Sequence, residues 1–269
     1  MRSGSKSMKF RRYSFYLLTA LVSGWAFIYP FLSKMEYLPF VPKAAVKVNV
    51  PDFAAMQDVT EKKKAFFAYL LPEIEKQNQL VLNQRHFVLA MEQKLGQGLD
   101  LNRRERSELR ALSDNYKVEY DEDEPDFSEM VTVLLRRVDV IPADLVLVQA
   151  ANESAWGTSR FARKGYNFFG LWCFKRGCGF VPLSRDDGAG HEVAKFPSLE
   201  RAVMTYIRNL NRHYAYKELR TIRQNLRKNQ QAITAESLVQ GLRSYSERGQ
   251  DYVDELLTMI RTNRKFMQI

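Results

Sequence analysis

The chain has 269 residues, 45% of them hydrophobic and 27% charged, and it carries a formal net charge of +10. This length and apolar content are ordinary for a globular protein with a sizeable core in one or two domains. Two cysteines and three scattered histidines do not make a ligand set with metal spacing, so a zinc site is disfavoured and no metal or organic cofactor is expected.

The N-terminus predicts a membrane anchor. A basic tail, residues 1–12, precedes an uncharged run, residues 13–32, which is long enough to cross a bilayer as one helix. Because the positive charges precede the run, the tail is expected in the cytoplasm and the rest of the chain across the membrane. A cleaved signal peptide is the alternative, but the run ends without a clear small-x-small cleavage site.

A proline-containing tether, residues 33–51, and a helical N-terminal extension, residues 52–140, are predicted to follow. Thr60 is the expected cap of the first helix of this extension. Pro72 interrupts the helical pattern, so it marks either a kink or the first turn of a second helix that continues to about Leu95.

Two further helices are predicted in the extension. Asn102 is expected to cap a charged helix over residues 103–116, and residues 127–138 predict the other. The acidic run between them, residues 119–126, is expected to be a solvated loop. Metal binding is the alternative for this run, although it lacks the glycine and the ligand spacing of a calcium loop.

The next stretch is expected to carry the chemistry. Residues 144–151 are mostly apolar at helical spacing, which predicts a buried helix that begins at Pro142 and ends before Gly157. Glu153 lies at its C-terminal end, where the helix dipole and apolar neighbours such as Trp156 favour the neutral carboxyl and raise its pKa. A carboxyl group with a raised pKa suits a general acid, whereas a lone glutamate at a helix end is usually a solvated surface residue.

An aromatic loop, residues 165–172, follows this helix. The motifs Glu153-Ser154-x-Trp156-Gly157-x-Ser159 and Asn167-x-Phe169-Gly170 together resemble the peptidoglycan glucosaminidases of glycoside hydrolase family 73, and within them the bacterial Bax-type proteins. The resemblance covers about Pro142 to the C-terminus. It implies an α+β, mostly helical fold: a lysozyme-like catalytic domain, residues 141–269, with a small β-hairpin lobe.

The remaining pattern agrees with such a domain. A β-hairpin is predicted over residues 177–196, and helices are predicted after a Ser198 cap and over residues 216–227, 234–242 and 251–266. A basic face is also predicted, which would meet anionic envelope polymers or lipid head groups, or nucleic acid if the domain were cytoplasmic. Its residues, which are alternatively simple solvated positions, are Arg208, Arg212, Arg220, Arg223, Arg227 and Lys228.

Cleavage of a β-glycosidic bond needs an acid, for which Glu153 is the candidate, and a second group that deals with the positive charge on the sugar. The resemblance implies that the second group comes from the hairpin or from a late tyrosine. Glu192 is the best-placed hairpin carboxylate, Asp186 and Asp187 are alternatives, and the N-acetyl group of the substrate is a third route.

Tyr245 and Tyr252 resemble the two tyrosines of the family segment Tyr-x-x-Asp-x-x-Tyr, with one residue inserted and the acid altered. The resemblance implies that Tyr245 points at the sugar site. The catalytic candidates are therefore Glu153, Glu192 and Tyr245. Trp172 is a candidate stacking platform for a sugar ring, whereas Asn167 and Phe169 have loop fixing and core packing as alternative roles. The candidate substrate-binding residues are Trp156, Asn167, Phe169, Trp172 and Tyr252.

Cys173 and Cys178 are a candidate disulfide that would fix the loop beside the site and add about 2 kcal/mol by the chain-entropy model. The complete prediction is a single-pass protein of the bacterial inner membrane whose periplasmic domain hydrolyses peptidoglycan after N-acetylglucosamine. A lysozyme or lytic transglycosylase that cuts after N-acetylmuramic acid and an inactive wall-binding scaffold are the alternatives. The expected partners are glycan strands and the inner membrane, without nucleic acid.

Overall fold

The computed structural model describes residues 49–181 and 191–267. The predicted tail and anchor, most of the tether, and the turn aspartates Asp186 and Asp187 lie outside these residues. Among the helices that are described, none is both long and apolar enough to cross a membrane. The chain from Asn49 onward forms one compact unit.

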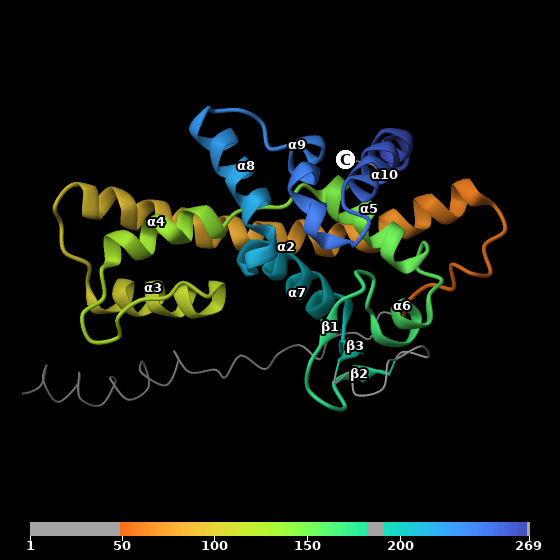
Figure 1. Cartoon of the computed structure of the whole chain (residues 1–269), viewed down its shortest axis with the longest axis horizontal. Coiled ribbons are helices and arrows are strands. Elements are labelled where there is room, and N and C mark those ends of the chain that lie inside the picture. The colour runs from red at the N-terminus through yellow and green to blue at the C-terminus, as the bar shows by residue number, and fades with distance from the viewer. Residues whose placement is uncertain (1–48, 182–190, 268–269) are drawn as a thin grey trace, which may run out of the picture. The chain divides into compact units, whose positions relative to one another are not determined.

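The longest element is helix α2, Val59–Gly96 (Figure 1). Its cap is Asp58, whose carboxylate accepts from Glu61 N at 2.8 Å, so the prediction of Thr60 as the cap was wrong by two residues. Pro72 lies inside the helix and does not divide it. A proline costs about 3 kcal/mol in a helix interior, and burial of apolar side chains on both sides of it offsets this cost. These side chains are Phe66, Phe67, Leu70 and Ile74.

Three helices follow: α3, Arg103–Tyr116, α4, Phe127–Arg137, and α5, Ala143–Ser154. The predicted Asn102 cap is confirmed, and it forms a reciprocal capping box with Glu105. Pro142 is the cap residue of α5 and not its first helical residue. Helix α2 packs against both α4 and α5, so the N-terminal helices share a core with the helix that carries Glu153.

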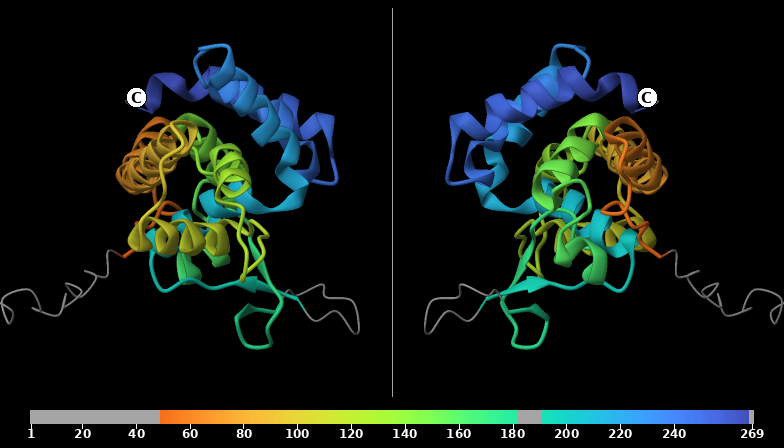
Figure 2. Two further views of the ribbon diagram at one scale, coloured as in Figure 1. Left: turned by 90° about the vertical axis from the view of Figure 1, so that its left-hand side faces the viewer. Right: turned by 90° about the vertical axis from the view of Figure 1, so that its right-hand side faces the viewer.

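The C-terminal half adds short helices around this core. They are α6, Arg160–Gly165, α7, Leu199–Arg212, α8, Lys217–Lys228, α9, Ala235–Leu238, and α10, Gln250–Asn263, with 3₁₀ segments η1, Tyr214–Tyr216, η2, Val239–Tyr245, and η3, Arg264–Phe266. Helices α8 to α10 lie on one side of α2, and α7 and the sheet lie on the other (Figures 1 and 2).

The helix predicted over residues 234–242 is instead α9 continued by η2. The change of helix type accompanies a close approach to α8. A Cβ at Gly241 would lie 2.3 Å from the backbone N and Cα of Leu219. The tighter 3₁₀ turn and the glycine together let the two backbones pass each other.

The small sheet has three strands, β1, Trp172–Cys173, β2, Gly179–Phe180, and β3, Glu192–Ala194, in the order β1-β3-β2. Strands β2 and β3 are the antiparallel pair that the hairpin prediction required, with Phe180 opposite Val193. Strand β1 was not predicted, and it pairs with the other edge of β3, placing Cys173 opposite Glu192. The aromatic loop is therefore joined directly to the hairpin lobe.

A buried ionic cluster joins α2 and α8 to the segment between α4 and α5. Asp139 is 2% exposed and meets Arg227 at 2.8 Å and Arg85 at 3.3 Å. Burial alone would raise the pKa of Asp139, but the hydrogen bond from Arg227 and the charges of Arg223 and Arg85 lower it overall. Arg223 and Arg220 are themselves buried, so the structure removes these two residues from the predicted basic face.

Candidate functional site

Glu153 lies in the last turn of α5, directly before a left-handed stretch of backbone. Ala155, Trp156 and Gly157 have φ values of 50°, 58° and 74°. The hydroxyl of Ser154 donates to the carbonyl one turn earlier at 2.6 Å and accepts from Gly157 N at 2.8 Å, which closes the turn. Consecutive non-glycine residues with positive φ are strained, and such strain is concentrated at functional sites.

The carboxylate of Glu153 is partly buried between α10 and the aromatic loop. Tyr252 donates its hydroxyl hydrogen to Glu153 Oε1 at 2.8 Å. On the other side, a Cβ at Gly170 would lie 3.4 Å from Glu153 Oε2. Burial raises the pKa of Glu153, and the hydrogen bonds from Tyr252 and Asn152 oppose part of this rise. The direction of the pKa shift is the one predicted for a general acid.

A group of tyrosines surrounds this carboxyl. The rings of Tyr245 and Tyr252 are parallel, with centroids 5.7 Å apart, and Tyr216 lies 5.8 Å from Tyr245. Tyr245 donates to the carbonyl of Phe169 at 2.8 Å, which ties η2 to the aromatic loop. Burial raises the pKa of Tyr245 and Tyr252 well above the ordinary value and that of Tyr216 to about 12, so these hydroxyls stay protonated. The structure thus places both predicted tyrosines at the site.

Two further residues belong to this group. Gln149 donates to the hydroxyl of Tyr252 at 2.9 Å, and Tyr206 of α7 donates to Gln149 Oε1. Neither residue is among the candidates that the sequence alone indicates. The available signal was that Gln149 is a polar residue within an apolar run, four positions before Glu153 and therefore on the same helix face.

Asn167 holds the aromatic loop in place. Its amide donates to the carbonyls of Leu171 and Ala194 at 2.9 Å each, and its oxygen accepts from the N–H of Leu171 at 3.0 Å. Phe169 stacks on Tyr206, with ring centroids 4.0 Å apart. Asn167 and Phe169 are each 1% exposed, so their side chains contact the protein itself and we assign them to loop fixing and core packing.

Trp156 packs against the N-terminal helix. Its ring lies 5.6 Å from that of Phe66 and 5.4 Å from that of Phe67, and the ammonium of Lys63 lies 5.0 Å from its centroid. These contacts give Trp156 a packing role against α2 beneath the turn. Gly157 lies against the same aromatic group, because a Cβ there would lie 2.5 Å from Phe53 and 3.2 Å from Phe66.

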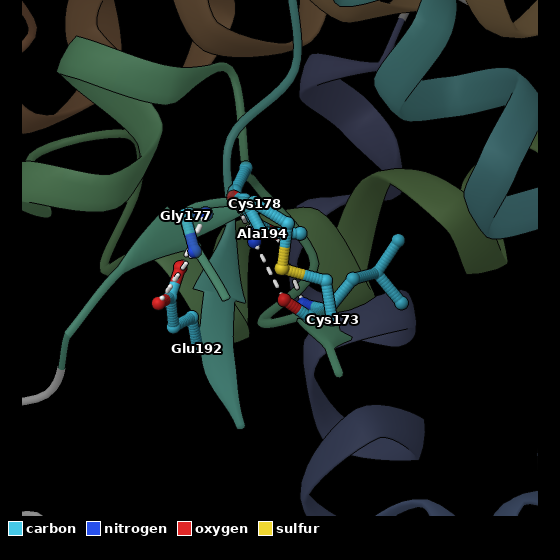
Figure 3. The surroundings of a disulfide bond; sticks show 8 residues. Cys173, Gly177, Cys178, Glu192 and Ala194 are labelled. Carbon is cyan, nitrogen blue, oxygen red and sulfur yellow. Dashed lines mark hydrogen bonds between the residues drawn. A yellow bond between two sulfur atoms is a disulfide. The ribbon is translucent and has the colours of Figure 1, made fainter. Parts of the chain in front are cut away.

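Cys173 and Cys178 form a disulfide bond (Figure 3). Glu192 of β3 fixes the loop that they close: its two carboxylate oxygens accept hydrogen bonds from Gly177 N at 2.9 Å and from Gly179 N at 2.8 Å. Glu192 is 4% exposed and lies within 4.8 Å of both sulfur atoms. Disulfide sulfurs are not thiolates, so this group of three is a fixed loop and not a set of metal ligands.

The surface beside this loop is aromatic. Trp172 is 49% exposed and its ring meets His191 edge-on at 4.6 Å. Phe174, inside the disulfide loop, is 83% exposed. Exposed flat apolar rings offer contact area to the apolar faces of sugars, which suits the role predicted for Trp172.

The chain has clear sequence relatives. The glucosaminidase family, described as mannosyl-glycoprotein endo-β-N-acetylglucosaminidase, matches residues 129–265. The Escherichia coli (strain K12) protein called Protein bax is 33% identical over 235 residues, which cover 87% of this chain and 81% of that protein. No solved structure matches the chain. With the matched region spanning the Glu153 helix, the aromatic loop and both tyrosines, the chain belongs to the glucosaminidase family of glycoside hydrolases.

Proposed function

We propose that the chain hydrolyses peptidoglycan at the β-1,4 bond after N-acetylglucosamine, with Glu153 as the general acid. The observation that carries the proposal is the setting of Glu153: burial raises its pKa, Tyr252 donates to one of its oxygens, and the other oxygen faces Gly170, which has no side chain. A protonated carboxyl of this kind delivers its proton to the leaving glycosidic oxygen.

The second catalytic group is part of the proposal. Glu192 has both oxygens engaged by the amides of the disulfide loop. This engagement supports a mechanism in which Glu153 is the principal acid and the N-acetyl group of the substrate attacks the sugar carbon. The tyrosine hydroxyls then support the developing charge as neutral dipoles, because their raised pKa values keep them protonated. A water-activating role for Glu192 would need the carboxyl groups to lie roughly 6.5–9.5 Å apart.

The position of Glu192 also favours one rival enzyme. A lysozyme or lytic transglycosylase works with a single glutamate at a helix end and cuts after N-acetylmuramic acid. The two activities release different fragments, since a transglycosylase leaves an anhydro ring and a glucosaminidase leaves a reducing N-acetylglucosamine end. Fragment analysis therefore decides between them.

The test is to incubate the chain from Lys43 onward, which contains the compact unit, with purified peptidoglycan and to identify the released ends by mass spectrometry. Glu153→Gln is the active-site variant, and Glu200→Gln, a surface acid of α7, is the control. We expect reducing N-acetylglucosamine ends from the wild type and from Glu200→Gln, and none from Glu153→Gln. Ends in N-acetylmuramic acid or its anhydro form would refute the bond specificity. Glycan binding without cleavage by all three proteins would indicate a scaffold.

We further propose that residues 13–32 anchor the chain in the bacterial inner membrane with the glucosaminidase domain in the periplasm. The charge asymmetry around this apolar run supports that orientation. A topology reporter fused after Ile269 is expected to be active only on the periplasmic side. Activity of a cytoplasmic reporter would contradict the proposal and would reopen nucleic-acid binding.

A further inference from the structure

A directional chain of hydrogen bonds runs behind Glu153. Tyr206 donates its hydroxyl hydrogen to Gln149 Oε1, Gln149 Nε2 donates to the Tyr252 hydroxyl at 2.9 Å, and Tyr252 donates to Glu153 Oε1 at 2.8 Å. Tyr206, Gln149 and Tyr252 are each at most 1% exposed. Every donor in the chain points toward the carboxylate.

The direction of this chain follows from the number of hydrogens available. A tyrosine hydroxyl has one hydrogen, so Tyr252 can donate to Glu153 only if its oxygen accepts from Gln149. Gln149 must then turn its NH₂ toward Tyr252 and its oxygen toward Tyr206, which donates its own hydrogen there. Turning the Gln149 amide by 180° would make the Tyr206 oxygen an acceptor and would take from the buried Tyr206 hydrogen the one acceptor that it has among the described residues, which is costly.

This arrangement has a consequence for the acid. In this orientation Tyr252 donates its hydrogen to Oε1, so that oxygen is an acceptor whether Glu153 is ionised or neutral. The carboxyl proton is therefore carried by Oε2. This oxygen faces Gly170, where φ is +63°, and a Cβ at Gly170 would lie 3.4 Å from it; among the described residues, Gly170's chain neighbours aside, no other heavy atom lies within 4 Å of that Cβ position.

We propose that Gln149 and Tyr206 are positioning residues that keep the catalytic proton of Glu153 on Oε2, on the side of Gly170, ready for the leaving glycosidic oxygen. The proposal rests on Glu153 being the general acid. Neither residue touches the substrate side of the carboxyl in this arrangement. Both act through Tyr252.

The other ionisable groups near Glu153 affect its pKa but do not take over the role of the hydrogen-bond chain. Glu255 of α10 raises the pKa of Glu153 by charge repulsion, and Arg248 lowers it, so their effects oppose each other. Tyr245 and Tyr216 carry raised pKa values and remain neutral donors. The chain through Gln149 accordingly supplies a directed hydrogen that these groups do not.

The test uses Tyr206→Phe, which keeps the ring that stacks on Phe169 and removes only the hydroxyl. Tyr116→Phe is the matched control, because Tyr116 also donates to a glutamine oxygen, that of Gln84 at 2.6 Å, and its ring is also buried. Gln149→Met removes the central member of the chain with a side chain of similar length. The readouts are kcat, KM and their pH dependence on peptidoglycan, and a ¹³C-carboxyl titration of Glu153 by NMR.

We expect Tyr206→Phe and Gln149→Met to lower kcat by roughly threefold to tenfold, the effect of one directed hydrogen bond, with little change in KM. The basic limb of the pH profile and the carboxyl titration of Glu153 should both move to higher pH, because Tyr252 stabilises the ionised form less well. Tyr116→Phe should leave both unchanged. Unchanged kcat, pH profile and carboxyl titration in the two chain variants would overturn the proposal.

The two proposals fail in different ways. Activity that survives in Glu153→Gln would remove Glu153 as the acid and would sink the proposed function. The carboxyl titration does not depend on activity, so it still decides whether Tyr206 and Gln149 direct a hydrogen to Glu153. A shift of kcat in Tyr206→Phe without any movement of the titration would leave a merely structural role and would also refute the inference.

Discussion

Replacing Gly157 with alanine tests whether residues before and within α2 form the support beneath the turn after Glu153. A Cβ at Gly157 would lie 2.5 and 2.9 Å from two ring carbons of Phe53 and 3.2 Å from Phe66. The φ of +74° adds a backbone cost of about 1–2 kcal/mol for a residue with a Cβ. Overpacking of a filled core costs about 1–3 kcal/mol. We therefore expect the free energy of unfolding to fall by about 2–5 kcal/mol.

Gly98→Ala is the matched control, since Gly98 has a φ of +71° and no heavy atom of the described residues within 4 Å of its Cβ position. Urea denaturation of both variants separates the two costs. We expect Gly157→Ala to lose about 1–3 kcal/mol more than Gly98→Ala, and Phe53→Leu to recover part of that excess. Equal losses in the two glycine variants would refute the packing of Phe53 and Phe66 beneath the turn.

Three further outcomes are expected. Glu153→Gln should be more stable than the wild type at pH 7, because the folded state raises the pKa of Glu153 and wild-type stability is therefore lost as the pH rises through that pKa. In urea titrations at a series of pH values, the difference in the free energy of unfolding should vanish below about pH 4, where Glu153 is protonated in both states. A difference that stays constant with pH would contradict this expectation. Arg223→Met should lose about 3–5 kcal/mol in thermal unfolding because it breaks a buried ionic cluster, whereas Arg163→Met, in an exposed pair, should lose less than about 1 kcal/mol; similar losses would count against the buried cluster. Replacing Cys173 and Cys178 with serine should lower the free energy of unfolding by about 2 kcal/mol, and no loss would mean that the amide bonds within the loop already hold it.

The parts of the fold that the sequence predicts well are those fixed by local chemistry. The Asn102 cap depends on a side chain and a backbone three residues away, and the raised pKa of Glu153 follows from an ionisable group at the end of an apolar helix. Pro72 shows the limit of this reasoning. A local rule predicts a break there, but contacts made by Phe66 and Ile74 with other helices decide the outcome.

The residues of the site also fall into those that the sequence indicates and those that only the tertiary contacts reveal. Glu153 and Tyr252 stand out because their residue types and spacing resemble a family motif. Gln149 and Tyr206 do not, since an amide and a tyrosine within apolar helix patterns are ordinary core residues until their partners are known. The position of Glu192 against the loop amides depends on the pairing of β1 with β3, a contact between segments separated by nearly twenty residues that no local pattern specifies.

The packing of α2 limits how this enzyme can be divided or exchanged. The family match begins at residue 129, yet the turn after Glu153 rests on Phe53, Phe66 and Phe67, which lie far upstream. A fragment cut at the start of the match would leave Trp156 and Gly157 facing water where aromatic rings belong. The glucosaminidase region is thus not an interchangeable cassette: a chimera would have to bring a helix with matching aromatic residues, and changes on either side of this contact are expected to be tolerated only in pairs.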